Sequence, residues 1–261
     1  MLFSIAYLAL FLAVGLGLAR RAVPDGASAV VLPLGCGFGI SLLAALPAAF
    51  ALVCGFTLRA VLLGGAGAAL LCAVLVFTGR GHARFAKDPD CGAMWLCLLP
   101  LLAVTLYLLH THVLHTVNGT LHTGQSCYGD MPMHLGFIEY IAQSGQFPPQ
   151  YPLLAGTHRF GYPFLCETVS SVFRVLGAGR RAAYLLPMVP ACISVYGMFW
   201  QLARRVLGSA GKASLAFYLF FMGSGFGFVY FLKDAETFKS IFTGFYTTPT
   251  NYTAQNIVWV N

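Results

Sequence analysis

An acidic residue and an imidazole lie one helical turn apart in the longest polar stretch of the sequence. Asp130 and His134 are four positions apart, so on a helix they would share one face. A carboxylate and an imidazole in this arrangement can abstract a proton or hold a metal ion. An ordinary helix N-cap explains the same pattern, because Asp is favoured at that position and Pro132 suits a first helical turn. The two interpretations are compatible, and Glu139 would point away from Asp130.

Four further charged or ionisable residues follow this stretch. Arg159, beside His158, lies where the polar segment returns to apolar sequence. A guanidinium there could hold a phosphate with two hydrogen bonds, or it could anchor the chain at a membrane interface. Glu167 and Arg174 are seven positions apart on one helical face. Ionisable residues within an apolar segment suggest function, although a mutual ion pair would also explain them.

A group of histidines precedes the polar stretch. His110, His112 and His115 form an HxHxxH pattern, with His122 beyond it. Zinc needs three or four converging ligands, and these three imidazoles cannot all share one helical face. The spacing therefore favours a structural or interfacial role over a metal site.

The overall composition defines the setting of these residues. Of 261 residues, 58% are hydrophobic and only 9% are charged, whereas soluble domains carry about 25% charged residues. A soluble enzyme is therefore excluded, and the composition predicts an all-α polytopic membrane protein in the lipid bilayer. The net charge of +7 is modest and sits mostly in short loops, so nucleic acid is not an expected partner. The eight cysteines include no CxxC pair and are expected to be free.

Apolar blocks of membrane-spanning length recur along the chain. With a weaker block, they predict a helix bundle of about six to seven spans and an outer loop that carries short helices. The strong blocks are 2–19, 29–54, 60–78, 93–115, 182–203 and 213–232, and the weaker one is 160–177.

The basic residues predict an orientation. Arg20 and Arg21 follow the first block, whereas residues 116–158 contain no Lys or Arg. The positive-inside rule therefore places the N-terminus and residues 116–158 on the extracytoplasmic side. The later pairs conflict, because Arg180-Arg181 and Arg204-Arg205 flank one block and cannot both be inside. Either block 160–177 does not cross the membrane, or one pair faces outward for another reason.

The polar stretch resembles a known loop. The order and spacing of its motifs are similar to the first extracytoplasmic loop of bacterial membrane proteins with a C-type glycosyltransferase fold. The segments 223–228 and 256–261 also resemble that group, so the likeness covers roughly residues 95–261. It implies a three-span extension over 1–92 and a partial module over 93–261, as in an N-terminal fragment of a longer protein. The motifs are Tyr128–His134, Phe147–Gln150, Pro152, Ala155-Gly156 and Tyr162–Phe164.

The resemblance also implies a function in the bacterial plasma membrane. Such enzymes transfer a sugar from a polyprenyl-phosphate carrier to an extracytoplasmic acceptor. Asp130 matches the acidic residue that acts as base or orients the acceptor, with His134 beside it. Asp234 and Glu236 match a second acidic element, provided that they lie outside. Arg159 with His158, or a divalent cation, would neutralise the carrier phosphate.

Two other functions compete with glycosyl transfer. A transporter would place Glu167 and Arg174 in a pathway near the middle of the membrane and use the outer loop as a lid. Transporters often show inverted repeats, and none is evident in this sequence. A non-catalytic subunit of a membrane assembly is the third interpretation.

Overall fold

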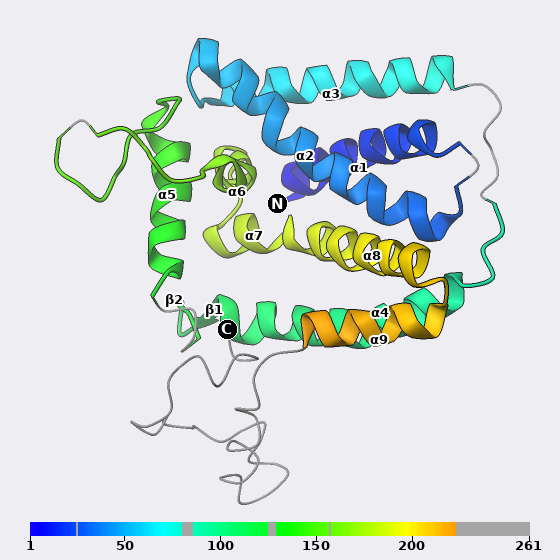
Figure 1. Cartoon of the computed structure of the whole chain (residues 1–261). Coiled ribbons are helices and arrows are strands. Elements are labelled where there is room, and N and C mark those ends of the chain that lie inside the picture. The colour runs from blue at the N-terminus through cyan, green and yellow to red at the C-terminus, as the bar shows by residue number, and fades with distance from the viewer. Residues whose placement is uncertain (25, 80–85, 125–128, 157, 223–261) are drawn as a thin grey trace, which may run out of the picture.

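The protein is an all-α helix bundle with one small β-hairpin, as the composition predicts (Figure 1). The computed structural model describes residues 1–24, 26–79, 86–124, 129–156 and 158–222. A π-helical turn, Leu109–Val113, continues α4, and the hairpin strands are β1 (His115–Val117) and β2 (Thr120–His122). The helices are α1 (Leu2–Ala22), α2 (Ser28–Cys54), α3 (Leu58–Thr78), α4 (Cys91–Leu108), α5 (Met131–Ser144), α6 (Leu165–Val175), α7 (Arg180–Leu185), α8 (Met188–Leu207) and α9 (Ala210–Phe221).

Five helical segments in the described part of the chain are long and apolar enough to cross a membrane. They are Leu2–Ala22, Ser28–Cys54, Leu58–Thr78, Cys91–Val113 and Arg180–Leu207. Each matches a predicted block, and together they make this a multi-pass membrane protein. Block 160–177 is not a span, because α6 has 11 residues and extends only about 16 Å, half the thickness of the hydrocarbon core. Block 213–232 extends beyond the described residues. The described part of this block belongs to α9.

Helix α2 lies at the centre and contacts α1, α3, α6 and α8. Glycines allow these close approaches, as expected for helices that pack in lipid. A Cβ on Gly15 of α1 would overlap the Gly35 carbonyl oxygen of α2. A Cβ on Gly64 of α3 would lie 2.9 Å from Pro47, and one on Gly197 of α8 would overlap Pro33.

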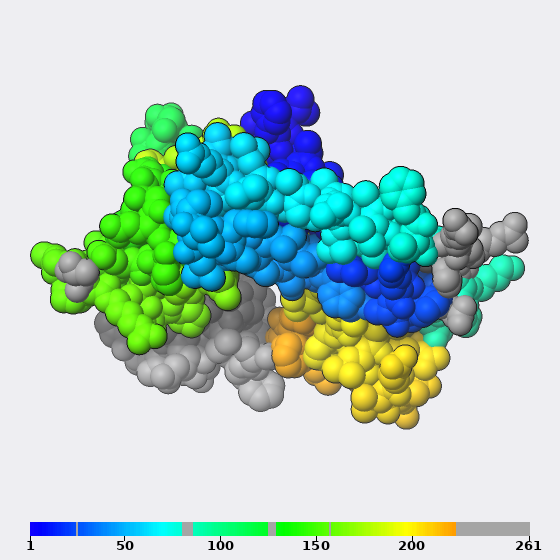
Figure 2. Space-filling view, turned by 90° about the horizontal axis from the view of Figure 1, so that it is seen from above, coloured from blue at the N-terminus to red at the C-terminus, as the bar shows by residue number. Residues whose placement is uncertain are grey.

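The bundle has two ends with different content (Figures 1 and 2). The loop end carries β1–β2, α5, residues 145–164 and α6, and there the Phe56 amide donates to the Gly145 carbonyl. The opposite end, here called the linker end, carries the α1–α2 connection and the ends of α3 and α8. At the linker end Arg204 forms a 2.6 Å ion pair with Asp90.

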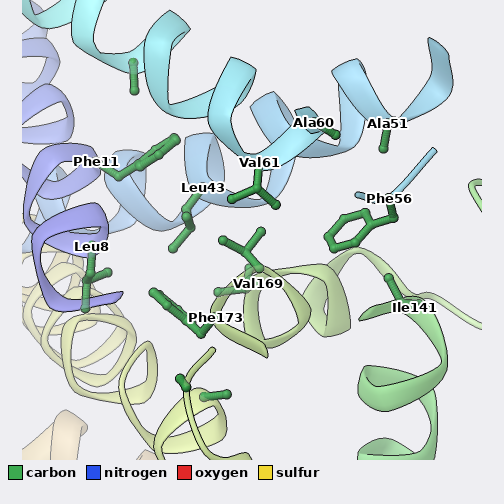
Figure 3. Packing of buried hydrophobic residues seen from close by; sticks show 14 of the residues in the cluster. Leu8, Phe11, Leu43, Ala51, Phe56, Ala60, Val61, Ile141, Val169 and Phe173 are labelled. Carbon is green, nitrogen blue, oxygen red and sulfur yellow. The ribbon is translucent and has the colours of Figure 1, made fainter. Parts of the chain in front are cut away.

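The short helix α6 completes the core beside α1–α3 (Figure 3). Val169 and Phe173 point from α6 toward Leu43 and Val61 of α2 and α3. All four side chains are at least 95% buried and belong to one cluster. The core therefore includes helices from both sides of residue 92. The domain boundary that the sequence predicts at this residue stays a prediction.

Candidate functional site

Local sequence explains where α5 begins and ends. Asp130 occupies the N-cap position and Pro132 lies in the first turn, where its missing amide hydrogen costs nothing. Gly145 ends the helix with a left-handed φ of 67°, which glycine adopts without strain. Ile141 of α5 is buried in the bundle core, whereas Phe137 is buried against aromatic residues of the 145–164 loop.

Asp130 occupies the N-cap position, but its side chain does not make the hydrogen bond to a backbone amide that an N-cap normally makes. Its backbone carbonyl accepts a 3.0 Å hydrogen bond from the His134 amide, so the two residues do lie one turn apart. The carboxylate makes no capping hydrogen bond and is exposed. Among the described residues the carboxylate has no recorded hydrogen bond or ion pair, which leaves it open to another group.

The partner of His134 is a carboxylate of α6. Its Nδ1 lies 2.6 Å from Oε1 of Glu167, whose side chain is only 7% exposed. The rings of Phe137 and Tyr162 meet the imidazole edge-on at centroid distances of 6.3 and 5.9 Å. The imidazole is therefore fixed between a buried carboxylate and two aromatic rings.

Aromatic residues hold the 145–164 loop against α5. Phe160 meets Phe137 edge-on at 4.7 Å, and Tyr151 contacts both rings. The exposed Cys166 lies beside Glu167. Burial and the Glu167 charge both raise the pKa of the Cys166 thiol, so it is a weak nucleophile at neutral pH.

A second ion pair joins α5 to α6. Arg174 donates to both carboxylate oxygens of Glu139, at 2.6 and 3.2 Å, and Arg180 donates to the same carboxylate at 3.2 Å. Burial opposes ionisation of Glu139, but the hydrogen bonds and charges of the two arginines outweigh it and lower its pKa. A mutual pair of Glu167 and Arg174 is therefore wrong, because each pairs separately with α5.

The polar seam between α5 and α6 comprises His134–Glu167, Arg174–Glu139 and a buried hydroxyl contact. The Ser171 hydroxyl donates at 3.0 Å to the Ile138 carbonyl of α5. The sequence analysis missed this partnership. The available signal was the spacing of Glu167, Ser171 and Arg174, which share one face of α6.

The structure explains how arginines can flank both ends of α7–α8. Since α6 is not a span, Arg180 and Arg181 lie at the loop end and Arg204 at the linker end. Arg181 donates to the Leu114 carbonyl at 2.9 Å and to His110, so local contacts hold it there.

The remaining predicted site residues are not brought to Asp130. His158 donates through Nε2 to the Ala155 carbonyl at 2.8 Å, and Arg159 is exposed in the same loop. Neither has a recorded hydrogen bond or ion pair with Asp130 or His134. The predicted second acidic element, Asp234 and Glu236, lies outside the described residues.

The histidines before α5 are arranged in a strand pair and a turn. His115 of β1 lies opposite His122 of β2, with ring centroids 5.9 Å apart. His110 instead accepts a hydrogen bond from Arg181 at 2.7 Å. Across the described ranges, three or more His, Cys, Asp or Glu side chains nowhere converge as metal ligands.

Comparison with known proteins adds no relative. No family model, no curated protein and no solved structure matches this chain. Any function must therefore be argued from the site. It consists of an open carboxylate at the start of α5, and this helix is held against α6 by the His134–Glu167 hydrogen bond and the Arg174–Glu139 ion pair.

Proposed function

We propose that the protein is a membrane-embedded glycosyltransferase-like enzyme of the bacterial plasma membrane. It would transfer a sugar from a polyprenyl-phosphate carrier to an acceptor at its loop end, which faces outward. The observation that supports this most is the Asp130 carboxylate. It is exposed at the start of α5, at one end of a bundle of membrane-length helices, and no described residue pairs with it. The type of reaction is proposed from the resemblance of the surrounding motifs to the first outer loop of C-type glycosyltransferases.

In this reaction Asp130 is the proton acceptor. It takes the proton of an acceptor hydroxyl while that oxygen bonds to the anomeric carbon of the sugar. The bond from the anomeric carbon to the carrier phosphate breaks, and the electron pair leaves with the phosphate on the lipid. A positioned general base typically contributes a factor of about 100 to 10,000 in rate.

The other residues of the site support Asp130 in different ways. His134 is a positioning residue, because its contact with the buried Glu167 fixes the first turn of α5. Arg159 would approach the leaving phosphate from the exposed part of the loop. We draw no step through a divalent cation, because the described residues do not present a set of metal ligands.

The transporter interpretation receives less support from the geometry. It requires Glu167 and Arg174 in a pathway through the membrane, whereas both side chains are paired with residues of α5. Their helix is too short to span the bilayer.

The test compares Asp130→Asn with wild type and with Asp88→Asn in membranes of the expressing bacterium. Each is supplied with polyprenyl-phosphate hexoses labelled in the sugar, and transfer of the labelled sugar from the lipid carrier to membrane acceptors is measured. We expect Asp130→Asn to lose about 100-fold or more of the activity, because the amide lacks the basicity of the carboxylate. Asp88 is a matched control, since it lies at the linker end and, within the described part of the chain, its carboxylate accepts a 2.9 Å hydrogen bond from the Asp90 amide. Equal activity of wild type and Asp130→Asn would refute the proposal.

A further inference from the structure

A pocket of about 840 Å³ opens at the loop end beside the β-hairpin. Its wall includes the hairpin residues Gly119–Leu121, the first residue Met1, and three arginines from α6 and α7. We call it the arginine pocket, after Arg174, Arg180 and Arg181. Asp130 and His134 do not line it.

The charges around the arginine pocket do not balance. Glu139 is the carboxylate that pairs with Arg174 and Arg180. Arg181 instead donates to neutral acceptors, the Leu114 and His110 carbonyls and the His110 ring. Three guanidinium groups thus face one carboxylate among the described residues, which makes the pocket a favourable place for an anion.

The arginines also retain hydrogen-bond donors that these contacts do not use. A guanidinium has five N–H donors. Arg180 uses only Nε, in a 3.2 Å contact, and its side chain is 56% exposed. Arg181 uses Nε and Nη2, which leaves Nη1. Planar groups with paired N–H donors match the oxygens of a phosphate.

The pocket lies at the level where lipid headgroups meet the protein. Met1 lines it, and the following Leu2 and Phe3 are each 79% exposed at the start of a membrane-length helix. Exposed apolar side chains on such a helix face lipid tails, so the adjoining charged groups lie at the interface. An anionic lipid that reaches the pocket from the membrane would therefore present its charged headgroup to the arginines.

We propose that the arginine pocket binds a phosphate group, with Arg180 and Arg181 as its principal donors. An anionic phospholipid headgroup and free phosphate both present the oxygens that this site requires. This site goes beyond the proposed function and does not depend on sugar transfer. Glu139, which pairs with two of the pocket arginines, follows Asp130 by about two and a half helical turns, so these two carboxylates lie on opposite faces of α5.

The experiment measures phosphate binding by the full chain in two arms. In the first, the protein is reconstituted in phosphatidylcholine vesicles with or without phosphatidylglycerol, and the lipid that copurifies is quantified by mass spectrometry. In the second, detergent-solubilised protein is titrated with inorganic phosphate in a calorimeter. The variant is Arg180→Gln, which leaves the Arg174–Glu139 pair in place, and the control is Arg59→Gln, an exposed arginine at the same end.

We expect Arg180→Gln to weaken binding roughly tenfold, as loss of a charged hydrogen bond does, while Arg59→Gln binds as wild type does. Enrichment of phosphatidylglycerol would identify a lipid headgroup, and binding of inorganic phosphate without enrichment would identify free phosphate. Both results support the site. It is overturned if wild type binds neither probe, if Arg180→Gln binds as wild type does, or if Arg59→Gln loses as much. An unchanged circular dichroism spectrum and melting temperature would show that Arg180→Gln still folds.

Discussion

Replacing His134 by leucine removes the imidazole that lies 2.6 Å from the buried carboxylate of Glu167. Removing the hydrogen-bond partner of a buried charge costs about 1–3 kcal/mol or more, because the remaining carboxylate stays in a poorly solvated place. The His134 side chain is 27% exposed, so water reaches the pair and reduces this penalty. We expect the single variant to lose about 2–3 kcal/mol of unfolding free energy, close to the value of a hydrogen bond to a charged group.

The assay is unfolding of the purified protein in mixed detergent, followed by circular dichroism and by proteolysis of the 145–164 loop. Proteolysis is informative because loss of the His134–Glu167 contact should first loosen α5 from α6, while the spanning helices stay packed. A double variant, His134→Leu with Glu167→Leu, removes both hydrogen-bonding partners and should recover most of the stability. If the double variant lost the sum of the two single losses, the two residues would be uncoupled and the polar seam would not hold α5 in place.

Three further outcomes are expected. Gly15→Leu should destabilise the bundle by about 3 kcal/mol in detergent unfolding, because its side chain would overlap α2, whereas Gly92→Ala, with open space around it, should change little. The lowered pKa of Glu139 contributes stability that is complete above its ordinary value of 4.5 and is lost as the pH falls through the lowered one. Glu139→Gln should remove this acid-dependent loss of stability, and an unchanged acid transition would contradict the assignment. A cysteine placed at Gln146 should react with an impermeant maleimide in intact cells, and labelling only after lysis would reverse the proposed orientation.

The spanning helices were predictable because each is a continuous apolar block. Leu2–Ala22 and Leu58–Thr78 agree with the predicted blocks to within a few residues. The N-cap position of Asp130 was equally local, since it depends on Asp and Pro only two positions apart. What local pattern could not predict is the partner of His134, because Glu167 is 33 positions away.

Block 160–177 shows why hydrophobicity alone misleads. It is apolar enough to resemble a weak span, yet the structure folds it into the short helix α6 with Glu167 and Ser171 buried. Those polar groups are tolerated because α5 supplies partners for both. Helical geometry places Glu139 away from Asp130, but it did not reveal that Glu139 joins α5 to α6 by pairing with Arg174 and Arg180.

The place of α6 in the core has a consequence for biogenesis. Helices α1 to α3 emerge from the ribosome well before residue 165, and each is apolar enough to enter the bilayer alone. Until α6 arrives, Leu43 and Val61 can rest against lipid tails at little cost, since a bilayer is as apolar as their later neighbours. Helix α6 cannot enter by itself, because Glu167 and Arg174 need α5 beside them. We therefore expect α5 and α6 to dock as a pair onto α1 to α3 after these three spans are already in the membrane.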